Sequence, residues 1–499
     1  MSFYTYDAVV FLVLVLLYGC ITTTLYSTQD EAEPHMVPTK LPFLEATIGI
    51  LRGKAGYLVE TKKKFPLPIF TLRMPFQRVY VVCANQFIHA VQSKAHAAAF
   101  VPTLLEFGIL FSGMAKSAKK CLQAGYKNGN QFTASVHSYL LWGPTLQSAT
   151  RLAMDRLISS MHSGFSSPDR VGLLETTQHQ LTLAMTGAVY GPHNPFNDPA
   201  MEADWNVFQR GISHLVNSPF PWLTAPMSIF ARNRLTRGFQ RYFETGGYLE
   251  AFAMIPEMYN KSLMLGIRPD EAAKMEIATS LAMLSSGSIT AFWLLLHILS
   301  KPTILRTCRE ELMALASTAP IRVVDTSLIK TNCPTIMAMF HETFRYHSSV
   351  VSVKKVAHNT TISDSFLLKK DALIMIPGPL VHHDPTIWGE NADRFDHTRF
   401  LTECGQKKLS NTSAFRPFGA GATACPGRHF STNIILTFVA IVVLGFDVEA
   451  SESWTVPTVK NADMWNAMPK PDSDIPVFIR PKFTNKAERF KFVWGSEES

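Results

Sequence analysis

A glycine-rich segment near the C-terminus has the residue types and spacing to bind a metal-containing cofactor. It reads Phe418-Gly-Ala-Gly-Ala-Thr-Ala-Cys-Pro-Gly427, and a helix is expected after it, from about residue 428 to 443. A cysteine at a helix N-terminus lies at the positive end of the helix dipole, which lowers the pKa of its thiol. A thiolate is a good axial ligand for haem iron, and glycines let the backbone approach a flat cofactor. Cys425 is therefore predicted to bind haem; the alternative is a glycine-rich turn with a buried cysteine.

A second motif, His341-Glu-Thr-Phe-Arg345, predicts a polar pair on a helix. Glu342 and Arg345 are three residues apart, so they share one helical face. Apolar neighbours indicate burial, and a buried ion pair requires further partners. Arg399, in Phe395-Asp-His-Thr-Arg-Phe400, is the predicted third member. The alternative is a solvated surface pair.

The central stretch from Ile277 to Ser300 contains no charged residue and is expected to be helical. Its hydropathy is compatible with a transmembrane helix. Six hydroxyl residues between Thr279 and Thr290 favour instead a helix buried on all sides in a large core.

Composition excludes several classes of protein. Of 499 residues, 47% are hydrophobic and 17% charged, which excludes a mainly disordered chain. The net charge of +8 comes without a dense basic run interleaved with aromatic residues, so no nucleic-acid partner is predicted. The seven cysteines show no CxxC spacing, which argues against a zinc site or a disulfide framework.

The N-terminus is predicted to anchor the protein in a membrane. Residues 3–25 are long and apolar enough to cross a bilayer, and basic residues follow this span without preceding it. We expect an anchor over residues 1–28, a proline-containing linker over 29–42 and a cytosolic body at the endoplasmic reticulum. A cleaved signal peptide is the alternative. The aromatic segment 218–230 is expected to contact the same membrane.

The body, residues 43–499, is predicted to be one large domain, mainly α with small β-sheets. Apolar, β-branched runs indicate strands at 66–84 and again at 348–380. Helical periodicity dominates from about 85 to 345.

In their order along the chain, these features resemble the cytochrome P450 family. The resemblance covers nearly the whole sequence and implies that family's fold, with haem b bound through Cys425. It implies that Phe418, Gly421 and Gly427 shape the haem-binding loop, and that Glu342, Arg345 and Arg399 form a structural triad. It also implies an NADPH-cytochrome P450 reductase as electron donor, because no flavin or nicotinamide fingerprint is present.

Two departures from the family pattern concern the site. Counting back from Lys301-Pro302, the acid and alcohol positions of the central helix fall on Ser285 and Ser286, so the usual carboxylate is absent. This resembles the branch that holds sterol 7α- and 12α-hydroxylases and prostacyclin synthase; a rival alignment puts Thr290 at the alcohol position. The cationic position before the cysteine is Thr423. The haem propionates then need other partners, and the candidates are Arg428, Lys354 and Lys355, with His137 and Trp142 as weaker ones.

Three functions follow as hypotheses. The first is a monooxygenase that oxidises an apolar polycyclic substrate of the sterol, terpenoid or meroterpenoid type in secondary metabolism, with Ser285 and Ser286 as catalytic residues. The second is a haem-thiolate isomerase or dehydratase that rearranges a peroxide without external electrons. The third is a haem sensor or electron carrier. Small residues at 282 and 285–287, with walls from residues 107–111, 292–293 and 348–352, favour a polycycle over a fatty acid or an aromatic polyketide.

Overall fold

The computed structural model is mainly helical with small sheets, and it divides into two compact units, each built from three chain segments. Unit 1 comprises residues 1–103, 349–392 and 411–423, and unit 2 comprises 104–348, 393–410 and 424–499. The structure describes residues 2–93, 98–99, 101–127, 131–165, 167–218, 220–317, 322–411, 413–421, 424–460, 466–482 and 490–495.

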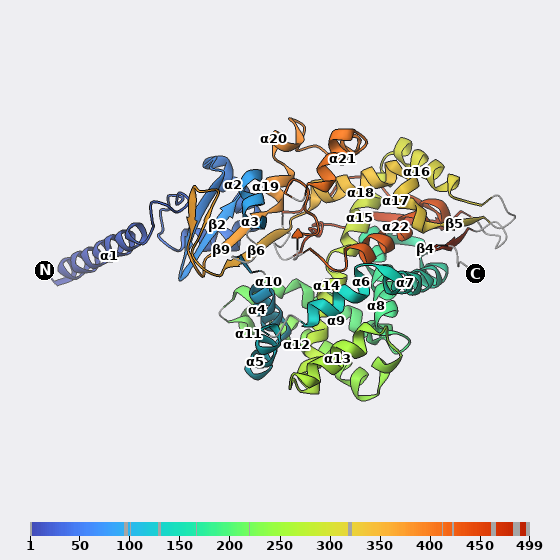
Figure 1. The fold of residues 1–499 in the computed structure, drawn as a ribbon, viewed down its shortest axis with the longest axis horizontal. Helices are drawn as coiled ribbons and strands as arrows, with labels where there is room; N and C mark the ends of the chain where they lie inside the picture. Colours follow the sequence, from blue (N-terminus) through green and yellow to red (C-terminus); the bar gives the residue numbers. More distant parts are fainter. Residues whose placement is uncertain are drawn as a thin grey trace. The chain divides into compact units, whose positions relative to one another are not determined.

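Unit 1 is built on a five-stranded sheet with strand order β1-β2-β9-β6-β3 (Figure 1). The strands are β1 (Ile69–Met74), β2 (Gln77–Val82), β9 (Leu373–Pro377), β6 (Val351–Val356) and β3 (Ala98–Ala99). All neighbours pair antiparallel except β2 and β9, which are parallel. The other regular elements are α1 (Ser2–Ser27), α2 (Glu45–Lys64), α3 (Asn85–Ser93), α19 (Gly378–His382), α20 (Pro385–Trp388) and the hairpin β7 (Thr360–Ile362) and β8 (Phe366–Leu368).

Unit 2 holds most of the helices, several of which start at a proline, whose fixed φ and missing N–H suit the first helical turn. Among them are α9 (Pro199–Arg210), α12 (Pro226–Glu244), α14 (Pro269–Leu284), α16 (Pro302–Ala314) and α18 (Pro334–His347). The other helices are α4 (Val101–Ser112), α5 (Lys116–Lys127), α6 (Gln131–Leu140), α7 (Gly143–Gly164), α8 (Leu173–Tyr190), α10 (Ile212–Asn217), α11 (Pro221–Thr224), α13 (Met254–Met264), α15 (Gly287–Leu299), α17 (Ile329–Asn332), α21 (Glu403–Ser410) and α22 (Arg428–Gly445). Short 3-10 turns lie at Pro195–Asn197, Gly247–Glu250, Thr326–Leu328 and His397–Phe400.

Two small sheets complete unit 2. One has the order β10 (Phe446–Ala450), β11 (Pro476–Pro481) and β4 (Ser167–Gly172), all antiparallel. The other pairs β12 (Lys491–Val493) with β5 (Val323–Asp325) in parallel.

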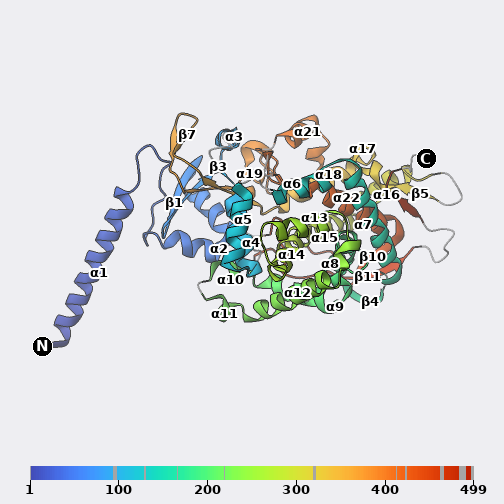
Figure 2. The same cartoon turned by 60° about the horizontal axis from the view of Figure 1, so that its bottom comes forward.

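The apolar helices α15 and α22 form the centre of unit 2. Every residue of α15 is buried, and it packs against α8, α18 and α22. Figure 2 shows α8, α14 and α15 gathered in this unit, with α12 and α9 beside them. Among the residues whose side chains the structure describes, two segments are long and apolar enough to cross a membrane, Pro269–Leu299 and Arg428–Gly445, and both are mostly buried inside the protein. The prediction that the central stretch is a core helix is therefore confirmed.

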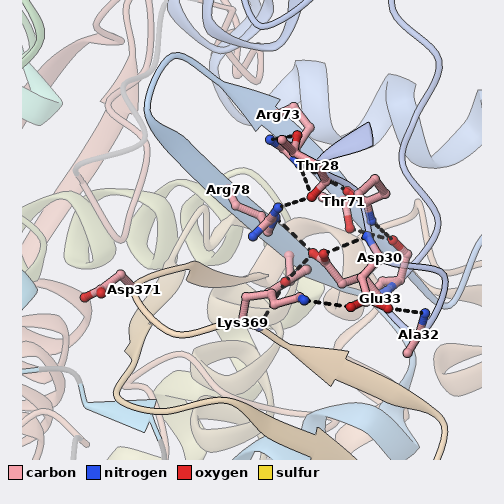
Figure 3. A network of polar contacts seen from close by, with 12 residues as sticks. Thr28, Asp30, Ala32, Glu33, Thr71, Arg73, Arg78, Lys369 and Asp371 are labelled. Atoms are coloured by element: carbon pink, nitrogen blue, oxygen red, sulfur yellow. Dashed lines mark hydrogen bonds and ion pairs between the residues drawn. The ribbon is translucent and has the colours of Figure 1, made fainter. Parts of the chain in front are cut away.

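The chain after α1 is held firmly against the sheet of unit 1. Glu33, 3% exposed, accepts a hydrogen bond from Tyr80 Oη at 2.6 Å and pairs with Arg78 Nε at 2.9 Å (Figure 3). Asp30 pairs with Lys369 at 2.7 Å, and the Thr28 carbonyl accepts from Arg78. Residues 28–33 are therefore fixed to β2 and to the β8–β9 turn by buried and half-buried charges.

The helix α1 itself is apolar and projects from the sheet of unit 1 (Figure 1). Leu12 to Tyr18 are 48–59% exposed, whereas Leu25 at its far end is buried. An exposed helix made of such side chains needs an apolar environment of its own, as expected of a membrane anchor.

Candidate functional site

The Cys425 segment forms the entry to α22 in unit 2. The Cys425 carbonyl accepts hydrogen bonds from the Arg428 amide at 3.4 Å and from Arg428 Nη1 at 3.0 Å. A Cβ atom on Gly427 would lie 4.0 Å from Cys425 Sγ, so the backbone at this glycine approaches the sulfur closely. The segment therefore holds a half-buried thiol at a helix N-terminus, the arrangement that the sequence predicted.

Burial and the helix N-terminus act in opposite directions on the pKa of the Cys425 thiol. Burial raises the pKa of Cys425, and this outweighs the backbone amides of Gly427 and Arg428 and the charge of Arg428, which all lower it. The helix N-terminus acts in the expected direction, but desolvation of the thiolate is the larger effect. A cation at the sulfur would reverse this balance, because a coordinating thiol is deprotonated.

The first half of the glycine-rich loop, residues 413–421, belongs to unit 1. Gly419 and Gly421 have φ of +75° and +63°, which a residue with a side chain adopts only with strain. Phe418, which directly precedes Gly419, is half-buried. Thr423 lies outside the described residues. The glycines are thus needed for the path of the loop.

The two candidate catalytic serines lie at a break in the central helix. α14 ends at Leu284 and α15 begins at Gly287, and Ser286 between them has φ −123° and ψ −30°. The hydroxyls of Ser285 and Ser286 are 3.5 Å apart, and both side chains are half-buried. The sequence predicted one continuous helix here, and this was wrong.

Thr290 has a different role from the serines. Its hydroxyl donates to the Ser286 carbonyl at 2.8 Å, and its amide donates to the same oxygen at 2.9 Å. The side chain is 1% exposed and is committed to the first turn of α15. This geometry favours Ser286 over Thr290 as the hydroxyl available for chemistry.

A close contact brings the serine break next to the cysteine helix within unit 2. A Cβ on Gly287 would lie 3.2 Å from Ser431 Oγ in the first turns of α22 and 3.9 Å from Met185 Sδ in α8. Ser431 is six residues after Cys425. Glycine at 287 therefore lets α15 approach the helix that carries the thiol.

Glu342, Arg345 and Arg399 form the predicted triad. Arg345 binds Glu342 through two bonds of 2.7 Å, and both side chains are fully buried. Arg399 Nε lies 3.3 Å from the same carboxylate, and the Asp396 amide donates to it at 2.7 Å. A buried ion pair is stable only when such additional donors complete it. The triad fixes α18 to the 393–400 segment.

Unit 1 contains a buried pair of cations that suits an anionic group. Arg416 is 2% exposed and Lys354 6% exposed, and neither has an ion pair with a carboxylate among the described residues. Arg416 Nη2 donates to Ser352 Oγ at 2.9 Å, while its Nε and Nη1 have no hydrogen-bond partner in the described part of the chain. Ser352 and Lys354 lie on the same face of β6, because alternate strand residues share a face.

Burial makes the positive charges of Arg416 and Lys354 unfavourable in the absence of an anionic partner. Burial lowers the pKa of Arg416 to about 10, and burial together with the Arg416 charge lowers the pKa of Lys354. Two desolvated cations without an anion are unstable, so a carboxylate such as a haem propionate fits this place. Sequence reasoning proposed Lys354 but missed Arg416, although it stands two residues before Phe418.

Lys355 and Arg428 fit the propionates less well. Lys355 is on the opposite face of β6, is about 40% exposed and pairs with Asp371 at 3.2 Å, so it is not a candidate. The Arg428 guanidinium donates to the Cys425 carbonyl and thereby supports the loop. Trp142 is 75% exposed and His137 is half-buried.

The predicted pocket wall at Phe292 and Trp293 belongs to the packed core. Trp293 is fully buried, donates from Nε1 to the Pro469 carbonyl at 2.9 Å and stacks on His347 with 3.9 Å between ring centroids. Of the small residues at 285–287, Gly287 at the start of α15 is the one that approaches α22, as described above.

Comparisons with known proteins agree with this arrangement. Residues 282–473 match the family model of cytochrome P450. The chain is 28% identical to cytochrome P450 monooxygenase nodJ of Hypoxylon pulicicidum, over 96% of this chain and 95% of that protein. It is 26% identical to cholesterol 7-alpha-monooxygenase of Cricetulus griseus, over 37% and 40% of the two chains, and 27% identical to prostacyclin synthase of Rattus norvegicus, over 44% and 47%.

A mainly helical fold with small sheets, a thiol at the entry to a core helix and a helix break beside it are the arrangement expected of a haem-thiolate enzyme. The match of residues 282–473 and the likeness of nearly the whole chain to a monooxygenase support a cytochrome P450 and an oxidoreductase of the monooxygenase type. The cytochrome P450 family implies a haem with thiolate-bound iron, a small-molecule substrate and a redox partner.

Proposed function

We propose that this protein is a membrane-bound haem-thiolate monooxygenase that oxidises an apolar polycycle of the sterol, terpenoid or meroterpenoid type. The observation that carries the proposal is the close approach of Gly287 to Ser431. It supports a site in which the Ser285–Ser286 break faces α22, the helix that follows Cys425. The haem b, when bound, supplies the reductive activation of dioxygen and the insertion of one oxygen atom.

Each candidate site residue has a defined role in this proposal. Cys425 binds the iron, and the backbone amides of Gly427 and Arg428 favour its thiolate form, because they lower the pKa of the thiol. Arg416 and Lys354 bind the propionates. Ser285 and Ser286 hold water by their hydroxyls and pass protons into the site in place of the usual carboxylic acid.

The substrate class is inferred from the residues near the break. Gly287 has no side chain and the two serines have short ones, which leaves room beside the haem for a rigid, bulky ligand held by few hydrogen bonds. The likeness to cholesterol 7-alpha-monooxygenase supports oxidation of a large apolar molecule. Ferric protein should be titrated with tetracyclic and linear ligands of matched apolar area, and tighter spin-state-shifting binding of the linear series would refute this class.

The membrane part of the proposal concerns α1 and the apolar patch 220–230, defined by Phe220, Trp222, Leu223, Met227 and Phe230. These five side chains are 56–66% exposed. Aromatic and large aliphatic side chains favour the membrane interface. We infer that α1 anchors the protein in the endoplasmic reticulum as a single span of residues 1–28, that 29–42 joins it to the catalytic body 43–499, and that this body faces the cytosol.

An isomerase or dehydratase is the second candidate, and the missing carboxylate at position 285 favours it. Such an enzyme rearranges a peroxide and needs neither electrons nor a proton relay. The two functions are separated by incubating purified protein and NADPH-cytochrome P450 reductase with a substrate identified by the spin-state titration. Product formation that requires NADPH supports the monooxygenase, whereas equal turnover without NADPH supports the isomerase.

A further inference from the structure

A cationic pocket in unit 2 has no part in the haem site. It has a volume of about 220 Å³ and lies between the turn after α4, one face of α12 and the first half of α14. Arg232, Arg237 and Lys274 line it together with uncharged polar side chains, Asn233 and Gln240 among them, and no carboxylate lines it. Since one water occupies ~30 Å³ in the liquid, the pocket has room for a phosphate group and its hydration.

Arg232 is held in place by the turn after α4. Its Nη1 donates to the Phe111 carbonyl at 3.3 Å, and Gly113 beside it has φ +71°. A Cβ on Gly113 would lie 2.6 Å from Arg232 Cζ, so the guanidinium lies against this turn only because residue 113 lacks a side chain. Burial lowers the pKa of Arg232, which reflects the cost of keeping the charge here.

Lys274 is also fixed, and its charge is partly offset. Its Nζ pairs with Glu271 Oε1 at 2.6 Å, and the other oxygen of Glu271 accepts from the Ala115 amide at 2.8 Å. The two arginines have no described carboxylate partner, so the pocket keeps a net positive charge. Guanidinium groups match the geometry of phosphate and bind it by paired hydrogen bonds.

The position of the pocket on α12 indicates the source of that phosphate. The apolar patch 220–230 ends at the first turn of α12, with Met227 and Phe230, and Arg232 to Arg237 follow on the same helix. At 1.5 Å per residue, Arg237 lies ~15 Å beyond Met227 along the axis. With the patch inserted about 5–10 Å below the headgroups and α12 rising along the membrane normal, Arg232, ~8 Å beyond Met227, would lie at the level of the lipid phosphates, and Arg237 no more than ~10 Å above it.

We propose that this pocket binds the phosphate of an anionic phospholipid headgroup. The inference rests on the proposed membrane contact of the patch 220–230. It adds to that contact a stereospecific lipid site, which would set the depth and tilt of the protein at the bilayer.

The test uses the full chain in neutral detergent, titrated with dihexanoyl phosphatidic acid and followed by native mass spectrometry. Arg237→Gln and the charge-neutral Gly113→Ala should each weaken binding by about tenfold, as expected for the loss of a charge-assisted hydrogen bond. Arg241→Gln is the matched control, because it removes an equal exposed charge from the same helix outside the pocket. The thiolate spectrum of each variant reports that it is folded.

Equal weakening by Arg237→Gln and Arg241→Gln would overturn the proposal, as would equal affinity for dihexanoyl phosphatidylcholine. Inorganic phosphate that binds as tightly as the lipid would refute the lipid as the occupant. The detergent titration needs no bilayer, so intact lipid binding with no vesicle association would refute only the membrane contact.

Discussion

At the scale of single residues, Glu276 on α14 is an unexpected acid in the core of unit 2. It is 3% exposed and accepts a hydrogen bond from Tyr190 Oη at 3.0 Å, while Ser280 lies 3.3 Å from the same phenol oxygen. Burial raises the pKa of Glu276 from its ordinary 4.5 to about 7. The carboxyl is therefore protonated in the folded protein at mildly acid pH, where an unfolded chain would already be ionised.

This shift predicts that stability falls as pH rises from about 4.5 to 7, because the folded state then binds more protons than the unfolded state. Above that window the charged carboxylate costs roughly 3 kcal/mol, at about 1.4 kcal/mol per pKa unit. Glu276→Gln should therefore raise the melting temperature at alkaline pH and have little effect at acid pH. Thermal unfolding at several pH values checks this.

Glu257 provides a control of opposite sign. Its bonds to Lys261 and Tyr139 lower the pKa of Glu257 to about 2, so Glu257→Gln should lose stability at neutral pH. A melting temperature of Glu276→Gln that is unchanged relative to the wild type across the pH range would contradict the burial of a protonated acid.

The proposed role of Ser285 and Ser286 predicts how tightly NADPH consumption is coupled to substrate oxidation. Changing both Ser285 and Ser286 to Ala removes the two hydroxyls at the helix break and should raise the share of NADPH electrons that is released as hydrogen peroxide. Thr290→Ser keeps the hydroxyl that bonds to the Ser286 carbonyl and is the control. Peroxide yield and NADPH consumption are measured together, and unchanged coupling in the double variant would count against these serines as the proton path.

Residue patterns revealed part of this site and missed part of it. Cys425, Glu342 and Arg345 could be predicted because each lies in a short motif whose spacing fixes its geometry. Arg416 could not, since a single arginine has no pattern, and its buried position depends on the packing of the loop onto β6. Glu276 was also missed, because the polar contacts that hold it come from another helix, α8.

At the scale of elements, the pairing of β6 with β9 decides which lysine is buried. Lys354 and Lys355 are adjacent, and either could have faced inward. The sequence therefore left both as candidate partners of the haem propionates. The register places Lys354 on the face of Ser352 and Arg416, and Lys355 on the opposite face with Asp371. A one-residue shift of the strand would reverse this assignment.

This arrangement predicts that Arg416→Ala and Lys354→Ala lower haem occupancy, since each removes a proposed partner of a propionate. We expect a loss of about tenfold or more in haem affinity for each, as charge-assisted bonds contribute ~1.5–3 kcal/mol. Lys355→Ala removes the same charge from the other face and should retain haem. Absorbance of haem per protein measures the effect, and equal haem loss in all three variants would contradict the assignment.

Hydropathy along the chain predicted the burial of the central helix but not its interruption. The stretch from 277 to 300 contains no charged residue, and the run Ser285-Ser286-Gly287 is the only local signal for a break, since Ser-Gly favours a turn. The close approach of Gly287 to α22 and α8 accompanies the break, and this contact joins residues far apart in the sequence.

At the scale of the whole molecule, the N-terminal helix and the network behind it determine how the protein can be held at a membrane. The sequence predicted a linker over residues 29–42 from its prolines and polarity. In the structure Asp30 and Glu33 are paired with Lys369 and Arg78, so the first part of that segment is fixed to the sheet of unit 1. These partners lie up to 339 residues away, which is why local composition could not reveal them.

Deleting residues 2–20 should weaken membrane association without abolishing it, because the patch 220–230 remains. The deletion removes the exposed part of α1 and keeps Leu25 and Thr28, which contact unit 1. Fractionation of cell membranes after a salt wash measures the effect. A glycosylation tag at the C-terminus should stay unmodified, and its modification would show a lumenal body and contradict the proposed topology.

The central claim is that Cys425 provides the thiolate ligand of the haem iron, and a carbon monoxide difference spectrum tests it most directly. The reduced wild-type protein should show the red-shifted Soret band of thiolate ligation, and Cys425→Ala should lose it. Cys308→Ala, which removes a buried thiol elsewhere in unit 2, should keep the band. A normal thiolate spectrum in Cys425→Ala would contradict the account and make Cys404 the next candidate.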